Sequence, residues 1–470
     1  MSSKDRHKNN KQVCIQGLGF VGSAMAIAIA SSITKLGKSE YQVIGVDLLN
    51  DTGRARVDAI NRGTFPFLTD DSDLKSALSK ASAQGRITAT TDEAVYETAD
   101  IIVVDVPLDL NSSQGAPVVN YGEFIEAVRT IGRHVREGAL IVIETTVPPG
   151  TCEKIVVPTI NEELERRNLS RDSVLIAHSF ERVMPGSNYL KSITNYWRVY
   201  AGYTVEAADA CEDFLSDIIN VKDYPLTRLA NVTSSEVAKV LENSYRAVNI
   251  AFVDEWTKFS ERLDIDLFSI IDAIQMRPTH SNIRYPGLGV GGYCLTKDPL
   301  FGPAAARDLH SMYDVSFPFS TMAIQINEKM PGHTVERLAR LFNGAMSGKE
   351  ILLCGVAYRS EVGDTRHSPS ETLVRMLERM GATVTSYDPF VTRWKELERH
   401  LPETLPEPRN FDAVVFAVPH KQFKELDLST WLSEERPIIL DTANIFNGID
   451  RSRWENEGIK VHSIGRGQNA

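Results

Sequence analysis

The stretch KQVCIQGLGFVG, residues 11–22, decides the first part of the fold. It joins a short apolar run to Gly17, Gly19 and Gly22, which have the spacing G-x-G-x-x-G. Between a strand and a helix, the first glycine allows a tight turn, the second lets a pyrophosphate approach the backbone, and the third lets helix and strand pack closely. The helix N-terminus adds N–H donors for the anion. The stretch therefore predicts a dinucleotide-binding strand–turn–helix unit.

The residues around this turn predict a doubly wound parallel sheet. Residues 11–16 and 41–48 are predicted as strands on either side of a helix over 20–36, and 101–106 and 140–144 are further apolar runs. Continuous apolar runs are typical of strands that are buried on both faces. The order strand, helix, strand is the signature of a βαβ unit.

Asp47 stands at the end of the second predicted strand. An acid at this position can accept hydrogen bonds from both hydroxyls of a ribose, and it would repel the 2′-phosphate of NADP. The predicted cofactor is therefore NAD. A tight turn that binds no ligand is the alternative interpretation of the glycines.

A second α/β unit is predicted near the C-terminus. Residues 349–358, 382–389, 411–419 and 436–444 repeat the order of the first four strands, with an acid again at the end of the second. This is a weak internal duplication of a doubly wound unit. The second copy lacks the three-glycine turn, so we expect it to bind something other than a dinucleotide.

A long helix is predicted between the two copies, over residues 233–263. Thr233 and Glu236 have the spacing of a capping box at its start. Apolar residues recur on nearly every side, which indicates burial in a large interface. At about 1.5 Å per residue the helix is roughly 45 Å long. We expect it to connect the domains and to form a subunit interface, in a homodimer or a higher even homo-oligomer.

The predicted architecture is α/β, with two Rossmann-like doubly wound parallel-sheet domains joined by a helical central domain. The expected boundaries are 1–228 for the NAD-binding domain, 229–332 for the central dimerisation domain and 333–470 for the C-terminal domain.

The composition excludes several classes of partner. Among 470 residues, 51 are Lys or Arg and 62 are Asp or Glu, which gives a net charge of −11. We therefore expect no general binding of nucleic acid or of an anionic membrane, and no apolar run is long enough to span a bilayer.

The five cysteines are scattered without C-x-x-C spacing. This argues against disulfides and a metal site, and for a reducing, cytoplasmic setting. The basic start followed by an apolar stretch is similar to a signal peptide, but the glycine turn explains that stretch better.

Two candidate catalytic residues lie four positions apart in the long helix. Lys239 and Asn243 share one helix face, whose surroundings are apolar. A solvated polar face is the ordinary explanation of such a pair. Burial is the alternative, and burial lowers the pKa of a lysine until it can act as a base.

The segment GLGVGGYCLTKDP, residues 287–299, is a second candidate site. Its four glycines remove side chains, so a ligand could lie against the backbone. Cys294 follows them, with Lys297 three residues on, and this is a setting that lowers the pKa of a thiol. Asp298 before Pro299 also fits a helix N-cap. The other four cysteines are expected to be small buried residues.

Several motifs together resemble the nucleotide-sugar 6-dehydrogenases, the family of UDP-glucose, GDP-mannose and UDP-N-acetylhexosamine dehydrogenases. Nearly the whole chain is covered, because six motifs stand in the family's order: GLGFVG with Asp47, TTVPPGT (145–151), ERVMPG (181–186), AKVLEN (238–243), GVGGYCLTKD (289–298) and GDTRHSPS (363–370).

The resemblance implies an NAD-dependent four-electron oxidation of the C6 alcohol of a nucleotide sugar to a carboxylate. Cys294 is similar to the family's nucleophile, which forms a thiohemiacetal and then a thioester. Lys239 and Asn243 would stabilise the oxyanion, and Asp298 would act with the lysine through a water molecule.

Further roles follow from the same resemblance. Thr146 would hold the catalytic water, Glu181 would assist thioester hydrolysis, and Arg366 would reach the nucleotide sugar. Phe180 departs from the pattern, because many members have a proline before this glutamate. The resemblance also implies a set of binding residues: Phe20, Val21, Pro107, Thr146 and Lys297 for the cofactor, and Glu181, Arg182, Val183, Arg284, Tyr285 and Gly291 for the substrate.

The substrate branch and the reaction class have alternatives. Glu144, Pro185 and the GxGVGG segment resemble the N-acetylhexosamine branch, so a UDP-N-acetylhexosamine is favoured. Lys297 is shared with the UDP-glucose and GDP-mannose branches, which makes UDP-glucose the second candidate. A two-electron hydroxyacid dehydrogenase would need neither the cysteine nor the second α/β domain. An inactive NAD-binding scaffold would not need Lys239, Cys294 and Asp298.

Overall fold

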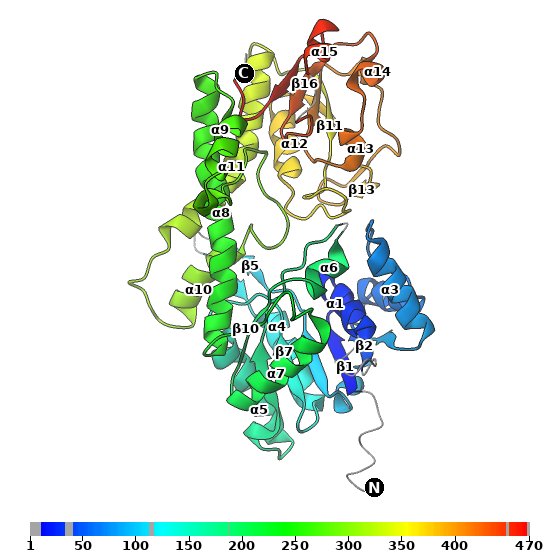
Figure 1. Ribbon diagram of the computed structural model, residues 1–470, viewed down its shortest axis with the longest axis vertical. Coiled ribbons are helices and arrows are strands. Elements are labelled where there is room, and N and C mark those ends of the chain that lie inside the picture. The colour runs from blue at the N-terminus through cyan, green and yellow to red at the C-terminus, as the bar shows by residue number, and fades with distance from the viewer. Residues whose placement is uncertain (1–10, 33–40, 112–116, 187, 448–450, 468–470) are drawn as a thin grey trace. The chain divides into compact units, whose positions relative to one another are not determined.

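The computed structural model describes residues 11–32, 41–111, 117–186, 188–447 and 451–467 (Figure 1). The basic start of the stretch that we compared with a signal peptide lies in residues 1–10, outside the described residues, whereas the apolar part lies within residues 11–32. The chain divides into two compact units, Met1–Leu241 with Leu300–Ser316 and Glu242–Pro299 with Phe317–Ala470. In the described ranges no helix is long and apolar enough to cross a membrane.

The first unit contains an eight-stranded sheet in the order β10-β9-β8-β7-β4-β1-β2-β3. Neighbouring strands are parallel except β8 and β9, which are antiparallel. The strands are β1 Lys11–Gln16, β2 Tyr41–Val46, β3 Ile87–Thr90, β4 Ile101–Val104, β7 Leu140–Ile143, β8 Leu175–His178, β9 Val199–Gly202 and β10 Thr227–Arg228, and a separate antiparallel pair is formed by β5 Asp109–Asn111 and β6 Val118–Asn120. The predicted doubly wound sheet is confirmed.

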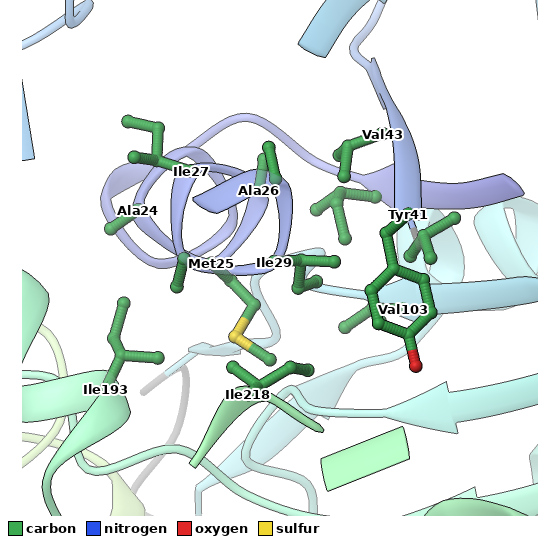
Figure 2. Packing of buried hydrophobic residues seen from close by; sticks show 14 of the residues in the cluster. Ala24, Met25, Ala26, Ile27, Ile29, Tyr41, Val43, Val103, Ile193 and Ile218 are labelled. Atoms are coloured by element: carbon green, nitrogen blue, oxygen red, sulfur yellow. The ribbon is translucent and has the colours of Figure 1, made fainter. Parts of the chain in front are cut away.

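Helices cover both faces of this sheet. Along β1, Val13 and Ile15 belong to one hydrophobic cluster with α1, whereas Cys14 belongs to another with α4 and α5. Alternate residues of a strand point to opposite faces, so this strand is buried on both faces of the sheet. Figure 2 shows side chains of the first cluster gathered around α1. The helices are α1 Phe20–Ser31, α2 Asp51–Asn61, α3 Ser72–Ala83, α4 Gly122–His134, α5 Val157–Arg166, α6 Tyr189–Thr194, α7 Val205–Ile218 and α10 Phe301–Asp308.

Several elements are shorter than the sequence suggested. The helix expected over 20–36 ends at Ser31, because the N–H and the hydroxyl of Ser32 both donate to the carbonyl of Ile29 in place of a further helical turn. Residues 33–36 lie outside the described part of the chain. Strands β2, β4 and β7 end one or two residues before the expected positions. The polar residues Asp47, Asp105 and Glu144 directly follow these strands, and each still donates its N–H to a carbonyl of the neighbouring strand.

The second unit contains a five-stranded sheet in the order β12-β11-β15-β16-β17, and all of its strands are parallel. The order β2-β1-β4-β7 of the first sheet recurs as β12-β11-β15-β16, which bears out the internal duplication. The elements are β11 Glu350–Cys354, β12 Thr383–Tyr387, β13 Arg393–Trp394, β14 Arg399–His400, β15 Ala413–Phe416, β16 Ile438–Asp441, β17 Val461–Ser463, α9 Leu267–Gln275, α11 Pro318–Leu341, α12 Pro369–Arg379, α13 Lys421–Lys424, α14 Leu428–Leu432 and α15 Arg451–Asn456.

The long helix α8, Val232–Arg262, begins and ends one residue before the predicted bounds. Its polarity differs from the prediction, because it is not apolar around its circumference. One stripe of large apolar side chains is 43–64% exposed. The opposite side buries charged and amide groups, including Glu236, Lys239, Asn243 and Glu261. The stripe consists of Val237, Leu241, Tyr245, Phe252, Trp256, Phe259 and, just past the helix end, Leu263.

The capping box expected at the start of α8 is wrong. Asn231 caps the helix, because its Oδ1 accepts from the N–H of Ser234 at 2.8 Å. Glu236 points elsewhere, and its carboxylate accepts from the N–H groups of Gly150 at 2.5 Å and Cys152 at 2.7 Å. These N–H groups lie at the start of the helical segment that continues into α5, where a negative charge is favourable.

Candidate active site

The glycine turn after β1 provides the space that a dinucleotide needs. Gly17 has φ +98°, and a Cβ there would lie 2.7 Å from the carbonyl oxygen of Asp105. A Cβ on Gly22 would lie 1.9 Å from the carbonyl oxygen of Gly17, so helix and turn can pack only without it. A Cβ on Gly19 would meet nothing within 4 Å. The open position is the one that faces the pyrophosphate in such turns, so the residues present fit NAD.

The acid at the end of β2 is held in place by the turn and by an arginine. Asp47 Oδ2 accepts from the N–H of Leu18 at 3.2 Å and pairs with Arg56 at 3.2 Å. Asp47 Oδ1 accepts from the N–H of Leu48 at 2.7 Å. The carboxylate is therefore fixed beside the glycine turn, where a ribose would be bound. Arg56 was not predicted from the sequence, although an arginine in the second turn of the helix after β2 is a usable signal.

The other residues expected at the cofactor lie near the same sheet edge or in the second unit. Phe20 begins α1 and stacks on Phe67 with ring centroids 4.0 Å apart. Val21 is half-buried in the first turn of α1, and Pro107 is exposed after β4. Thr146 is half-buried in the loop after β7.

A charged cluster lies at the ends of β4, β7 and β8 in the first unit. Arg198 is buried and pairs with the buried Glu144, and burial lowers the pKa of Arg198 to about 10. Burial raises the pKa of Asp105 well above its usual value, the charge of Glu181 raises it further, and Arg198 opposes both. Asp105 and Glu144 each follow a buried strand directly. Asp105 also departs from the family pattern, in which a threonine is common before Pro107.

Lys239 of α8 contacts the loop that follows β8. It is 5% exposed, which settles the sequence alternatives in favour of burial. Its Nζ donates to the carbonyl oxygen of Glu181 at 2.8 Å and lies 3.9 Å from Glu181 Oε1. The Glu181 carboxylate also accepts from the N–H of Val183. Arg182 donates to the carbonyl of Trp197. The motif ERVMPG therefore supplies a main-chain acceptor and a nearby carboxylate around one buried lysine.

In the second unit, Asn243, Lys297 and Asp298 form a buried polar cluster. Asp298 is 1% exposed, and its Oδ2 accepts from Asn243 Nδ2 at 2.7 Å. Its Oδ1 accepts from Lys297 Nζ at 3.0 Å. The side chain thus contacts an amide and an ammonium, and it does not serve as the helix N-cap that we considered. Lys297 Nζ also lies 4.4 Å from the ring centroid of Tyr293.

Cys294 is exposed, whereas the other four cysteines are buried, as expected. Burial raises the thiol pKa to about 12 at Cys14 and Cys211, and well above the usual value at Cys152 and Cys354. The main-chain oxygen of Cys294 accepts from the N–H groups of Lys297 and Asp298 at 3.2 and 2.9 Å. A single tight turn therefore joins the accessible thiol to the lysine and the acid.

The glycines before Cys294 have a different role from the one expected. A Cβ on Gly291 would lie 2.6 Å from the carbonyl oxygen of His367, and a Cβ on Gly292 would lie 2.8 Å from the ring of Tyr358. The N–H of Gly292 donates to the carbonyl of Arg366 at 3.1 Å. The space at these two glycines is filled by the chain itself, so they bring the cysteine turn close to the GDTRHSPS segment rather than exposing backbone to a ligand.

The remaining predicted substrate residues lie in the second unit. Arg366 pairs with Asp364, with Nη2 2.7 Å from Oδ2, and lies 5.4 Å from the ring centroid of Tyr293. Arg284 is half-buried, and burial lowers its pKa. The hydroxyl of Tyr285 donates to Asp272 Oδ1 at 2.6 Å, so this group is anchored on α9.

The glycine turn, the acid after β2 and the parallel order of the sheet define a protein that binds a nicotinamide dinucleotide at the carboxyl edge of its first sheet. The chain belongs to the UDP-glucose/GDP-mannose dehydrogenase family, and the resemblance drawn from the motifs is confirmed. The family's NAD binding domain matches residues 11–217, its central domain 233–329 and its UDP binding domain 352–448. The chain is an NAD-dependent nucleotide-sugar dehydrogenase.

Individual relatives and solved structures match the chain along its whole length. It is 30% identical to the UDP-N-acetyl-D-mannosamine dehydrogenase of Methanocaldococcus jannaschii over 100% of both chains. It is 27% identical to the NDP-N-acetyl-D-galactosaminuronic acid dehydrogenase of Ralstonia nicotianae over 93% of this chain and 96% of that one. The solved UDP-N-acetyl-D-mannosamine dehydrogenase of Pyrococcus horikoshii is similar with a TM-score of 0.79 and 26% identity, covering 98% of this chain and 100% of that one.

Proposed function

We propose that the protein oxidises the C6 hydroxymethyl group of a UDP-N-acetylhexosamine, with UDP-N-acetylmannosamine as the first candidate, to the uronic acid in two steps. The observation that carries the mechanism is the exposed thiol of Cys294 on the turn that also holds Lys297 and the buried Asp298. The substrate class is supported by the names of the relatives and by Glu144, Pro185 and the GxGVGG segment.

The first oxidation needs a proton acceptor and a stabilised oxygen. NAD, when bound, accepts the hydride that leaves C6 in each oxidation. Asp298, acting through a water molecule, takes the proton of the C6 hydroxyl, which makes hydride loss easier. Lys239 and Asn243 donate hydrogen bonds to the developing oxyanion, and buried donors of this kind lower the barrier. The product of this step is the C6 aldehyde.

The second oxidation needs a covalent bond to the protein. The thiolate of Cys294 adds to the aldehyde carbon to give a thiohemiacetal, and loss of a second hydride gives a thioester. Water held by Thr146 then attacks the thioester carbon with the help of Glu181, which releases the carboxylate and returns the thiol. Arg366 binds the nucleotide sugar, together with Arg182, Val183, Arg284 and Tyr285.

Two further features belong to the proposal. We infer that two chains associate through the exposed apolar stripe of α8, because so large an apolar surface is unfavourable in water. We also infer a cytoplasmic location, which is supported by five free cysteines that show no C-x-x-C spacing.

The stoichiometry of the reaction tests the proposed function. A panel of UDP-N-acetylmannosamine, UDP-N-acetylglucosamine, UDP-N-acetylgalactosamine and UDP-glucose is incubated with NAD, and NADH absorbance and product mass are measured. We expect two NADH and one carboxylate for each N-acetylated sugar consumed. A preference for UDP-glucose would overturn the substrate class. An aldehyde product with one NADH would overturn the four-electron mechanism.

A further inference from the structure

The phenyl ring of Phe180 lies beneath two cations in the first unit. Phe180 is fully buried, directly before Glu181. The Nζ of Lys239 lies 5.3 Å from the ring centroid, and the guanidinium carbon of Arg182 lies 5.2 Å from it. A cation within about 6 Å of an aromatic face is attracted by the ring quadrupole, and the attraction grows when both groups are removed from water.

One carboxylate lies near the Lys239 ammonium, but it does not form a hydrogen bond with it. Among the described contacts of its ammonium, the carbonyl oxygen of Glu181 accepts one hydrogen bond at 2.8 Å. The carboxylate of Glu181 lies at 3.9 Å, beyond hydrogen-bond distance. Desolvation of an ammonium is costly unless partners replace the lost water. The face of Phe180 therefore adds to what the Glu181 carbonyl and carboxylate provide.

The neighbouring histidine adds no negative charge to the surroundings of Lys239. His178 is fully buried in β8, and its Nδ1 lies 2.8 Å from the hydroxyl oxygen of Ser235. Burial first, and then the charge of Lys239, lower the pKa of His178 to about 3. The imidazole is thus neutral near neutral pH. The groups that face the ammonium from β8 and its following loop are this neutral ring, the Phe180 face and Glu181.

We propose that Phe180 is a positioning residue, whose ring holds the Lys239 ammonium charged and in place to donate to the oxyanion of the substrate. The inference rests on the proposed function for the role of Lys239. Many members of the family have a proline at this position, and a proline ring has no π face. The contact is therefore a feature of this chain rather than a property of the motif.

Fluorinated phenylalanines test the ring without changing its shape much. Mono-, di-, tri- and pentafluorophenylalanine are incorporated at position 180, which weakens the quadrupole in steps. The reaction of the Lys239 amine with an acylating reagent is followed by mass spectrometry as a function of pH. We expect the pH of half-maximal reaction to fall with each step, by about one pH unit at full fluorination. The same series at Phe124, another fully buried phenylalanine of the first unit, is the control and leaves this midpoint unchanged.

Kinetics on the same proteins provide the second readout. We expect kcat with the nucleotide sugar to fall by about tenfold across the series at fixed alkaline pH, with a smaller change in KM. Phe180→Leu, which keeps an apolar side chain but removes the π face, should reproduce the end of the series. The proposal would be overturned if the pH of half-maximal acylation of Lys239 did not depend on fluorination. If the parent protein oxidises no nucleotide sugar, the proposed function fails, but the amine titration still decides the role of the ring.

Discussion

Asp47 and Arg56 form one charged pair at the end of β2, and this pair bears on cofactor choice. The carboxylate is the group that would accept the ribose hydroxyls, and Arg56 lies 3.2 Å from it. While the acid is present, a 2′-phosphate meets a negative charge at the ribose position. Without the acid, the arginine becomes a partner for that phosphate.

Replacing Asp47 should therefore convert repulsion into attraction. In Asp47→Ser we expect the Kd for NAD to rise by about tenfold, because charge-assisted hydrogen bonds to the ribose are lost. NADP binding should become measurable by calorimetry. The double variant Asp47→Ser with Arg56→Gln is the matched control and should bind NADP poorly. Equal binding of NADP by both variants would show that Arg56 has no part in the discrimination.

Cys294 is the residue whose replacement should separate the two oxidations. Serine is nearly isosteric with cysteine, but it does not form a thioester equivalent that hydrolyses usefully. In Cys294→Ser we expect turnover to fall by several orders of magnitude, while binding of NAD and nucleotide sugar is retained. The variant should still reduce a supplied 6-aldehyde with NADH, because that step depends on Lys239 and Asp298.

The control for this variant is Cys14→Ser. Cys14 is fully buried in β1, where burial raises its thiol pKa to about 12, so its replacement should change stability and leave turnover near that of the parent. Turnover of Cys294→Ser within a few-fold of the parent would refute the covalent mechanism.

At the scale of elements, α8 shows where sequence periodicity succeeds and where it stops. The recurrence of apolar residues located the C-terminal end of the helix within one residue, and the spacing of Thr233 and Glu236 located its start within one residue, although the cap itself is Asn231. The recurrence did not show which side of the helix is buried, because the buried side carries polar groups whose partners lie far along the chain. Asn243 contacts Asp298, and the carboxylate of Glu261 contacts His333 at 3.0 Å. Such partners cannot be inferred from helical spacing alone.

The exposed stripe of α8 should hold two copies of the chain together. Trp256 packs edge-on against Phe252 and Phe259, with ring centroids 6.4 and 5.9 Å apart, at the centre of the stripe. In Trp256→Lys we expect light scattering to show the mass of a single chain, whereas the parent is a dimer or a higher even oligomer. Arg262→Glu, an exposed change on the same helix, should leave the mass unchanged. A parent that is monomeric at micromolar concentration would contradict the proposal.

Glu236 joins the first turn of α8 to the start of the segment that leads into α5, and it should make stability depend on pH. The hydrogen bonds that its carboxylate accepts from two N–H groups lower its pKa. Burial has the larger effect and raises the pKa from 4.5 to about 7. The native state therefore holds the proton more tightly than the unfolded chain. The contribution of this group is complete below pH 4.5 and is lost as the pH rises through 7, by on the order of 3 kcal/mol.

The measurement compares unfolding midpoints of Glu236→Gln and the parent from pH 4.5 to 8. The variant cannot titrate at this position, so we expect its midpoint to fall less steeply with pH than that of the parent. Glu255→Gln, an exposed change on the same helix, should keep the parental slope. Identical slopes for Glu236→Gln and the parent would show that the pKa of Glu236 is not raised in the native state.

At the scale of the molecule, one doubly wound plan is used twice with different loops. Asp388 ends β12 as Asp47 ends β2, but its Oδ2 accepts from the N–H groups of Val356 and Ala357 and lies 3.1 Å from His420 Nε2. The loop after β11 thus folds onto the acid that would otherwise meet a ribose. The absence of the three-glycine turn predicted a different ligand for the second unit. Only the structure shows that main-chain N–H groups of the same unit bind the Asp388 carboxylate.

The division of roles between the units leads to a prediction about stoichiometry. NAD should bind once per chain, in the first unit, while UDP binds through the domain that matches residues 352–448.

Gly19 offers a clean test of this prediction. A side chain there would enter open space, and the backbone of Gly19 has a φ of −69°, which any residue can adopt. In Gly19→Leu we expect NAD binding to disappear from calorimetric titrations, since the side chain fills the place of the pyrophosphate. The unfolding temperature and UDP binding should stay close to those of the parent, whereas Gly22→Ala should lower the unfolding temperature, because its Cβ would meet the carbonyl of Gly17 at 1.9 Å. Two NAD per parent chain would show that the second unit also binds the dinucleotide. Unchanged NAD binding in Gly19→Leu would show that the pyrophosphate does not lie at Gly19.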